Sequence, residues 1–248
     1  MAIHDFTSQR LHVEGDLAEG AEIACSAEQS NYLRNVLRLE AGRRLLVFNG
    51  RDGEWQASLQ LKGKRDAFLL IGARSRPQTG GPDIDYLFAP LKRSRLDYMV
   101  QKATEMGVAR LRPIITERTI AERVNLERMR ANAIEAAEQC GVLRVPEVLP
   151  PEKLMGLLSK WRADRAIVFC DEDAIEHDPI KALGAIPRGT PLAVLIGPEG
   201  GFSDAERAAI RATGAAHVIG LGPRIMRADT AAVAALALVN AVLGDWSP

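Results

Sequence analysis

Two glycine-rich segments contain residue types whose spacing suggests binding chemistry. The first, Gly-Pro-Glu-Gly-Gly at residues 197–201, comes directly after the apolar run Leu192–Ile196. Because glycine has no β-carbon, a flat ligand can approach the main chain of such a loop closely. A tight connector between a strand and a helix would also explain one or two glycines. We favour a binding loop, since three glycines around a proline and a glutamate are more than a connector requires.

The second segment, residues 220–230, contains two arginines, Arg224 and Arg227, on either side of an Ile-Met pair. It follows an expected strand and precedes an alanine-rich helix that either Asp229 or Thr230 can cap. Helix N-termini disfavour cations, so the position of the arginines favours a functional role. Two solvated side chains near a helix start are the alternative.

Neither segment matches a dinucleotide, phosphate-loop or hydrolase motif. Both lack G-x-G-x-x-G, no Gly-Lys-Ser/Thr follows, and Gly201–Ala205 lacks the closing glycine of a nucleophile elbow. Ser203 and Glu206 form an S-x-x-E pattern, which predicts a capping box at the start of a helix.

The elements that must position these loops fall into two parts. The first part reads as strands around one helix, Ser26–Leu37, and suggests a small barrel; its strands are Arg10–Val13, Arg44–Phe48, Trp55–Leu61 and Ala67–Ile71. Residues 75–82 collect turn formers without an apolar residue, which favours a linker. We therefore expect two domains, residues 1–76 and 82–248.

In the second part, strands and helices alternate. The expected strands are Ile84–Ala89, Leu111–Thr116, Ala166–Cys170, Pro191–Ile196 and His217–Leu221. The expected helices are one from Ser94 as its cap to Gly107, Asn125–Cys140 closed by Gly141, Pro151–Ser159, Ser203–Ala212 and one from about Thr230. Alternation with nearly continuous apolar strands predicts an α/β parallel sheet covered on both faces. Ligands on such sheets bind at the carboxyl ends of the strands.

Composition is that of an ordinary globular protein: 248 residues, 47% hydrophobic and 26% charged, which excludes disordered and fibrous classes. Three cysteines and four histidines lie far apart without ligand spacing, so we expect no metal. The N-terminus is charged, and the longest apolar run, Thr230–Leu243, contains Asn240 and is too short to cross a bilayer. We expect a soluble cytoplasmic protein with no membrane partner.

The formal net charge is zero, from 32 basic and 32 acidic side chains, which argues against a uniformly basic surface. The charges are unevenly distributed, however. Residues 81–130 hold 10 basic and 7 acidic side chains, whereas residues 131–183 hold 6 and 10. Local basic patches can bind phosphates even when the total is neutral. Ordinary solvated faces are the alternative.

Both glycine-rich segments resemble the RsmE family of 16S rRNA (uracil-N3)-methyltransferases, which belong to the SPOUT class. Ile196–Glu206 and Leu221–Ala231 carry the resemblance most strongly. It extends over nearly the whole chain through Tyr32–Arg38, Phe48–Gly53, Gln101–Val108, Thr116–Arg118 and Glu135–Gly141. The chain departs from the family where Met226 replaces a usual leucine, where Ala228-Asp229 replaces a common Thr-Glu, and where Val142 replaces a frequent arginine, with Arg144 the nearest substitute.

The resemblance implies a PUA-like β-barrel for RNA, followed by a SPOUT α/β domain with a C-terminal trefoil knot, in a homodimer. It also implies methylation of a uridine N3 in 16S rRNA of the small ribosomal subunit, with S-adenosylmethionine as methyl donor. The implied cofactor-binding residues are Leu195, Gly197, Glu199, Gly200, Ile219, Leu221, Gly222, Ile225 and Met226.

Methyl transfer to a ring nitrogen requires alignment of two partners and loss of the N3 proton. Arg227 is the residue expected to stabilise uracil or its phosphate, while Glu172 and Asp171, after the strand Ala166–Cys170, are candidate bases. The cations expected to bind RNA are Arg10, Arg34, Arg38, Lys92, Arg93 and Arg95. A non-catalytic RNA-binding or assembly protein and a SPOUT ribose 2′-O-methyltransferase are the alternatives.

Overall fold

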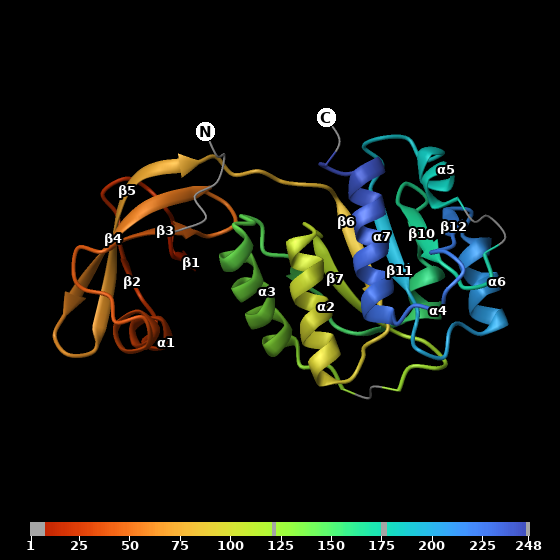
Figure 1. Cartoon of the computed structure of the whole chain (residues 1–248), viewed down its shortest axis with the longest axis horizontal. Helices are drawn as coiled ribbons and strands as arrows, with labels where there is room; N and C mark the ends of the chain where they lie inside the picture. Colours follow the sequence, from red (N-terminus) through yellow and green to blue (C-terminus); the bar gives the residue numbers. More distant parts are fainter. Residues whose placement is uncertain (1–7, 121–122, 175–177, 247–248) are drawn as a thin grey trace. The chain divides into compact units, whose positions relative to one another are not determined.

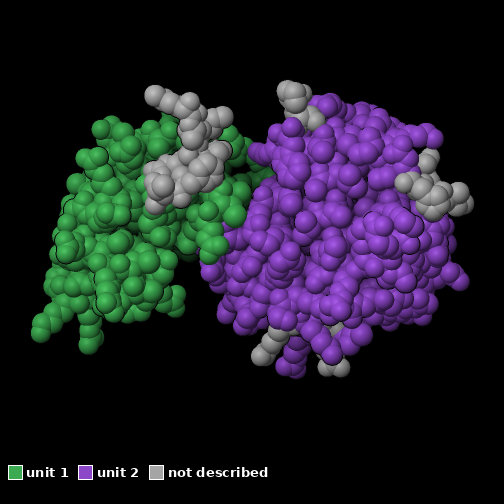
Figure 2. Space-filling model, viewed as in Figure 1, with its two compact units in different colours: residues 1–80, 137–145 green, residues 81–136, 146–248 purple. Residues whose placement is uncertain are grey.

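The computed structural model describes residues 8–120, 123–174 and 178–246. It divides into two compact units, coloured separately in Figure 2. Unit 1 contains residues 1–80 and 137–145, and unit 2 contains residues 81–136 and 146–248. The division after Gly80 falls within the segment of turn formers. Residues 137–145, which the sequence boundary placed in the second domain, group with unit 1.

Unit 1 is built on a five-stranded sheet with the order β1-β3-β4-β5-β2. Its strands are β1 (Arg10–His12), β2 (Glu22–Ala24), β3 (Arg44–Phe48), β4 (Glu54–Lys62) and β5 (Asp66–Arg76). β1 pairs with β3 in parallel, and the other pairs are antiparallel. Alternate residues of the long strands face one core, in which Leu59, Leu69 and Leu33 are fully buried.

The helical segment of unit 1 covers the predicted range Ser26–Leu37, but only its first part is an α-helix. α1 (Ala27–Asn31) starts at a capping box between Ser26 and Gln29 and continues into a π-helical turn, Tyr32–Val36. The next residue but one, Arg38, has a φ of 53°, a left-handed conformation that ends the helical segment. β2 was not predicted; its three residues are held mainly by pairing with β5.

Unit 2 contains a parallel seven-stranded sheet with the order β12-β10-β11-β6-β7-β8, and β9 pairs with β7. Figure 1 labels β12, β10, β11, β6 and β7 of this sheet. Its strands are β6 (Ile84–Phe88), β7 (Arg110–Ile115), β8 (Glu147–Val148), β9 (Glu152–Lys153), β10 (Ala166–Cys170), β11 (Leu192–Ile196) and β12 (Ala216–Ile219). The predicted parallel α/β sheet is therefore confirmed.

Helices cover both faces of this sheet. They are α2 (Arg93–Glu105), α3 (Leu126–Cys140), α4 (Leu154–Leu158), α5 (Pro179–Gly184), α6 (Asp204–Ala212) and α7 (Ala228–Val242). α4 and α6 share a core with Leu87, Phe169 and Leu195 on one face. α7 packs against β11 and beside α2, and its buried residues include Leu236 and Val239.

Three sequence predictions about these helices are wrong. α2 starts after Lys92, without a side-chain cap, rather than at a Ser94 cap. α7 starts after Arg227, so neither Asp229 nor Thr230 caps it. The segment 151–159 was expected to be one helix, but it begins as strand β9 and continues as α4. In addition, the sequence did not predict α5, which the Asp178 side chain caps.

Candidate active site at the carboxyl edge of the parallel sheet

The loop 197–201 leaves the carboxyl end of β11, which lies between β10 and β6 in the sheet. Leu195 is fully buried in β11, so the start of the loop is anchored in the core. A Cβ on Gly197 would lie 2.6 Å from a ring carbon of the buried Phe202. Gly201 has a φ of +69°, in the left-handed region that favours glycine. Both glycines are therefore required by the local geometry.

The end of this loop is fixed by the predicted capping box. The Glu206 backbone N–H donates to Ser203 Oγ, and Glu206 Oε2 accepts from the Ser203 backbone N–H over 3.0 Å. Glu206 Oε1 also accepts a 2.8 Å hydrogen bond from the backbone N–H of Glu117. The Glu206 carboxylate thus connects the start of α6 to the loop after β7.

Two arginines hold the middle of the loop. Arg95 from α2 forms an ion pair with the Glu199 carboxylate. Arg118, in the loop after β7, donates from Nη1 to the Gly200 carbonyl oxygen over 2.7 Å. The sequence did not single out Arg118 as a site residue. Its position a few residues after a strand of the sheet is the signal that could have identified it.

The second loop follows β12 and ends at α7. Ile219 is fully buried at the end of β12, Leu221 is half-buried, and Gly222 has a φ of +92°. Met226 is half-buried, whereas the Ile225 side chain is 101% exposed. An apolar side chain without protein contacts, beside a glycine turn, can cover a flat ligand ring.

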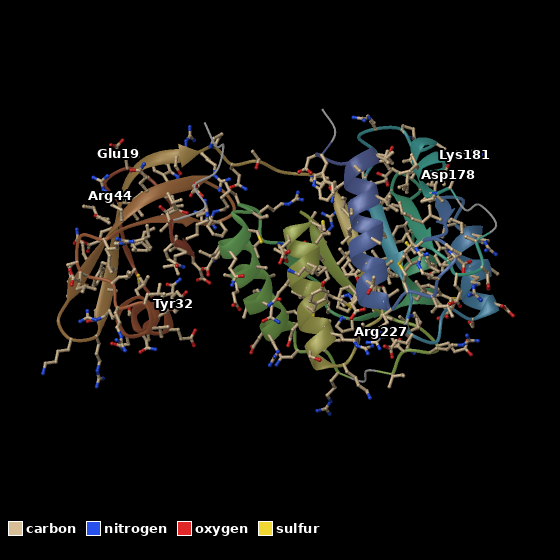
Figure 3. The ribbon with its side chains drawn as sticks, in the orientation of Figure 1. Glu19, Tyr32, Arg44, Asp178, Lys181 and Arg227 are labelled. Carbon is tan, nitrogen blue, oxygen red and sulfur yellow. The ribbon has the colours of Figure 1, made fainter. Side chains whose placement is uncertain are left out.

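Arg227 is exposed and occupies the N-cap position of α7 (Figure 3). The first N–H groups of a helix give this end a partial positive charge. Arg227 therefore adds a full charge to a position that already favours anions.

Three acidic residues, Asp171 to Asp173, follow β10 and share Arg207. The two candidate bases among them differ in accessibility. Asp171 is buried and accepts hydrogen bonds from Arg207 Nε over 3.1 Å and from Arg211 Nη2 over 3.0 Å. The Glu172 side chain is 61% exposed and accepts from Arg207 Nη2 over 2.9 Å. Glu172 is thus the more accessible carboxylate. Arg207 and Arg211 were not singled out by the sequence.

The cations expected to bind RNA lie in different environments. Arg10 is 4% exposed and forms a 2.9 Å ion pair with Glu54, so its prediction as an RNA-binding residue is corrected. Arg34 donates to the carbonyl oxygens of Asp66 and Gly63, at the turn between β4 and β5. Arg38 is exposed.

The remaining predicted RNA contacts lie at the start of α2. Lys92 is exposed, and Arg95 is half-buried beside Glu199. Arg93 is the first residue of α2, and its side chain lies outside the described part of the structure. The sequence therefore located a cluster of cations, but Arg95 already has a carboxylate partner.

Val142, where the resembling family frequently has arginine, packs with Phe48, Ala137 and Leu143 in a small core of unit 1. Arg144 is half-buried nearby in the sequence. Within the described residues, no three His, Cys, Asp or Glu side chains come together as a metal site. The helices of the described chain are also too short or too polar to span a membrane.

Comparison with known proteins now defines the class. A family model described as an RNA methyltransferase domain matches residues 79–240, and one described as an RNA methyltransferase PUA domain matches residues 26–71. The chain therefore combines an RNA methyltransferase domain with a PUA domain.

Relatives specify the family. The chain is 28% identical to ribosomal RNA small subunit methyltransferase E of Rickettsia conorii, over 93% of this chain and 94% of that one. Identity to the Synechocystis protein of the same name is 31%, over 94% and 78% of the two chains. The chain belongs to the ribosomal RNA small subunit methyltransferase E family.

Solved structures agree with this assignment. The Neisseria gonorrhoeae ribosomal RNA small subunit methyltransferase E, bound to S-adenosylmethionine, matches with a TM-score of 0.87 and 26% identity, over 97% of this chain and 100% of that one. A methyltransferase from Legionella pneumophila, in complex with the same cofactor, matches with a TM-score of 0.84 and 29% identity, over 96% and 99%. The expected SPOUT-class fold is confirmed, while the knot stays a prediction.

Proposed function

We propose that this enzyme transfers a methyl group from S-adenosylmethionine to N3 of a uridine in 16S rRNA of the small ribosomal subunit. The names of the relatives support a small-subunit rRNA substrate, and two structural neighbours support the cofactor. The observation that carries the proposal is the pair of glycine-rich loops at one edge of a parallel sheet, each immobilised at its ends by buried residues.

The residues of these loops fit the cofactor. Glycines leave main-chain groups open along residues 197–201, and Ile225 provides an apolar side chain that nothing in the described chain covers. We assign cofactor binding to Leu195, Gly197, Glu199, Gly200, Ile219, Leu221, Gly222, Ile225 and Met226. When bound, S-adenosylmethionine supplies an electrophilic methyl group on a sulfonium centre.

The chain must then hold the uracil in line and assist loss of its N3 proton. Arg227 is positioned to stabilise the negative charge that develops on the ring, or its phosphate, because it adds a cation to the N-terminus of α7. Glu172 is the candidate base, because its carboxylate is exposed and Asp171 is enclosed by two arginines.

RNA binding is assigned to the PUA-like unit together with cations at the start of α2. Arg38 and Lys92 are exposed, and Arg34 and Arg93 complete this set. The unit boundary, with a PUA-like domain ending near residue 76 and a methyltransferase domain from residue 82, is part of the proposal. So are the homodimer, the trefoil knot and a cytoplasmic location.

One product experiment tests the function. Unmodified small-subunit rRNA is incubated with enzyme and labelled cofactor, digested to nucleosides and analysed by mass spectrometry. N3-methyluridine is the expected product. A ribose-methylated nucleoside would contradict the proposal and favour the ribose 2′-O activity. Absence of both methylation and cofactor binding by calorimetry would favour a non-catalytic RNA-binding protein.

A further inference from the structure

An open depression, here called the lateral pocket, lies in unit 2 among the loops that follow β6, β7 and β11. Its apolar walls are Pro90, Leu91, Ile120 and Pro198, and its polar side chains are Lys92, Arg118 and Glu199. β11, β6 and β7 are neighbours in the sheet, so these loops meet at its carboxyl edge.

The loop 197–201 is a wall shared by two sites. On the β6 and β7 side it borders the lateral pocket through Pro198 and Glu199. β10 and β12, whose loops carry Glu172 and residues 220–227, lie on the other side of β11 in the sheet order. A ligand in the lateral pocket would therefore contact loop 197–201, which is itself one of the two proposed cofactor loops.

The charge in the lateral pocket is positive. Among the described lining residues Glu199 carries the one carboxylate, and its ion pair with Arg95 balances most of that negative charge. Lys92 and Arg118 remain as cations, and both are exposed. A pocket with two such cations favours an anion.

One hydrogen bond fixes the Arg118 guanidinium, and its other N–H groups remain able to bind a ligand. Its Nη1 donates to the Gly200 carbonyl oxygen over 2.7 Å, and its aliphatic stem passes over Gly200, where an added Cβ would lie 3.4 Å from Arg118 Cδ. A guanidinium has five N–H donors, so one backbone contact leaves others for a ligand. A fixed, partly engaged arginine suits recognition of a phosphate.

We propose that the lateral pocket binds the nucleotide that is to be methylated. The uracil ring contacts the walls formed by Pro90, Ile120 and Pro198, while Lys92 and Arg118 bind its phosphate. This inference rests on the proposed function, because a base must leave its stack before a ring nitrogen is accessible. Apolar walls replace part of the lost stacking, and cations bind the backbone of the extruded nucleotide. A free inorganic anion would gain nothing from the apolar walls.

The first experiment measures methyl transfer and cofactor binding separately. Arg118→Gln and Lys92→Gln each remove one positive charge, and Arg130→Gln on α3 is the matched control, because Arg130 is exposed outside the lateral pocket. We expect kcat/KM for rRNA to fall about 10-fold or more in the two pocket variants, as for loss of a charge-assisted hydrogen bond. The Kd of Lys92→Gln for S-adenosylmethionine, and both quantities in the Arg130→Gln control, should stay within twofold of the wild type.

Two results would overturn the inference. One is a kcat/KM within twofold of the wild type in both pocket variants. The other is a weakened cofactor Kd in Arg118→Gln with normal kcat/KM at saturating cofactor, which would assign the anion to the cofactor's own carboxylate. Should Arg118→Gln not fold, Ile120→Glu provides the same test, since the Ile120 side chain is 72% exposed. Ile180→Glu, on the 49% exposed Ile180 of α5, is its control.

A second experiment does not depend on activity. The full-length protein with S-adenosylmethionine is irradiated with 4-thiouridine 5′-monophosphate, digested, and mapped by mass spectrometry. We expect cross-links within residues 90–92, 118–120 or 198–199, reduced in Arg118→Gln. Cross-links confined to other segments, or none above the Arg118→Gln background, would overturn the pocket assignment. Cross-links here without N3-methyluridine formation would refute the proposed function while leaving the pocket assignment intact.

Discussion

Arg207 donates a hydrogen bond of 2.9 Å to the carboxylate of Glu172. The same guanidinium also binds Asp171, whose side chain is fully buried. One cation therefore contacts both candidate bases, and of these two only Glu172 extends into solvent. The sequence does not distinguish Asp171 from Glu172 as a candidate base. In the structure Asp171 is a buried partner of Arg207, whereas Glu172 remains accessible.

Glu172→Gln tests the candidate base. The amide keeps the size of the side chain but cannot take the N3 proton, so kcat should fall about 100-fold, the lower range for loss of a general base. Asp173→Asn is the matched control, because Asp173 also pairs with Arg207, over 3.2 Å. Single-turnover methyl transfer at saturating cofactor measures the effect. Equal rates in the two variants would show that Glu172 only holds Arg207.

Arg227→Ala should lower kcat by about 100-fold at saturating cofactor, a typical cost of removing one group that stabilises developing charge. Arg224→Ala in the same loop is the control, since Arg224 is also exposed but does not occupy the N-cap of α7. A rate for Arg227→Ala within twofold of the wild type would remove this residue from the mechanism.

Gly201→Ala tests the spacing between the glycine-rich loop and Glu172. An added Cβ would lie 2.5 Å from Glu172 Oε1, so the carboxylate must move away from its Arg207 contact. Gly214→Ala is a close control, because Gly214 has nearly the same φ, +68° against +69°, and nothing within 4 Å of an added Cβ. Each variant should lose about 1–2 kcal/mol of stability from left-handed strain. Only Gly201→Ala should also lose methyl transfer; equal activity in both would refute the coupling.

The carboxylate of Glu54 should make the stability of unit 1 depend on pH. Burial alone would raise the pKa of Glu54, but hydrogen bonds from Arg76 and Arg10 outweigh it and hold the pKa below its ordinary value. A lowered folded-state pKa stabilises the fold above the unfolded pKa, about 4.3, and this contribution is lost as pH falls through the folded pKa. Glu54→Gln removes the buried carboxylate that Arg10 and Arg76 share and should cost about 3–5 kcal/mol at pH 7.

Hydrogen exchange of β3–β5 at pH 7 and at lower pH measures this effect locally. The wild type should lose protection as the pH is lowered, whereas Glu54→Gln should start less protected and change less. Glu22→Gln is the control, because the ion pair of Glu22 with Lys62 is exposed and contributes little. An unchanged difference between wild type and Glu54→Gln over this pH range would contradict the assignment.

The cysteines predict a simple labelling order. Burial raises the pKa of Cys170 to about 12 and that of Cys25 to about 11, whereas Cys140 is exposed. At pH 8 the half-buried thiols of Cys25 and Cys170 are almost entirely protonated, so a disulfide reagent should modify Cys140 first. Cys140→Ser should abolish the fast phase. Rapid labelling of Cys170 in the folded protein would show that β10 is more accessible than described.

Local sequence patterns specified the elements that depend on local physics. The strands β3 and β10 lie where their apolar runs predicted, and the Ser203–Glu206 capping box forms as expected. The strands depend on the alternation of side chains along the chain, and the capping box depends on hydrogen bonds between residues three positions apart. β2 escaped prediction because its three residues gain their order from pairing with β5.

The sequence by itself determined the class of fold, the two glycine-rich loops and the family to which they belong. Only the tertiary structure decided what each charged side chain does. Arg10 looks like a surface cation in the sequence, yet Glu54, 44 residues away, binds it in the interior. Arg118 was only part of a matching stretch, yet it reaches a carbonyl oxygen 82 residues further along. Charged residues do not recur at a regular spacing along the chain. The order of the strands in the sheet therefore decides which charged side chains meet.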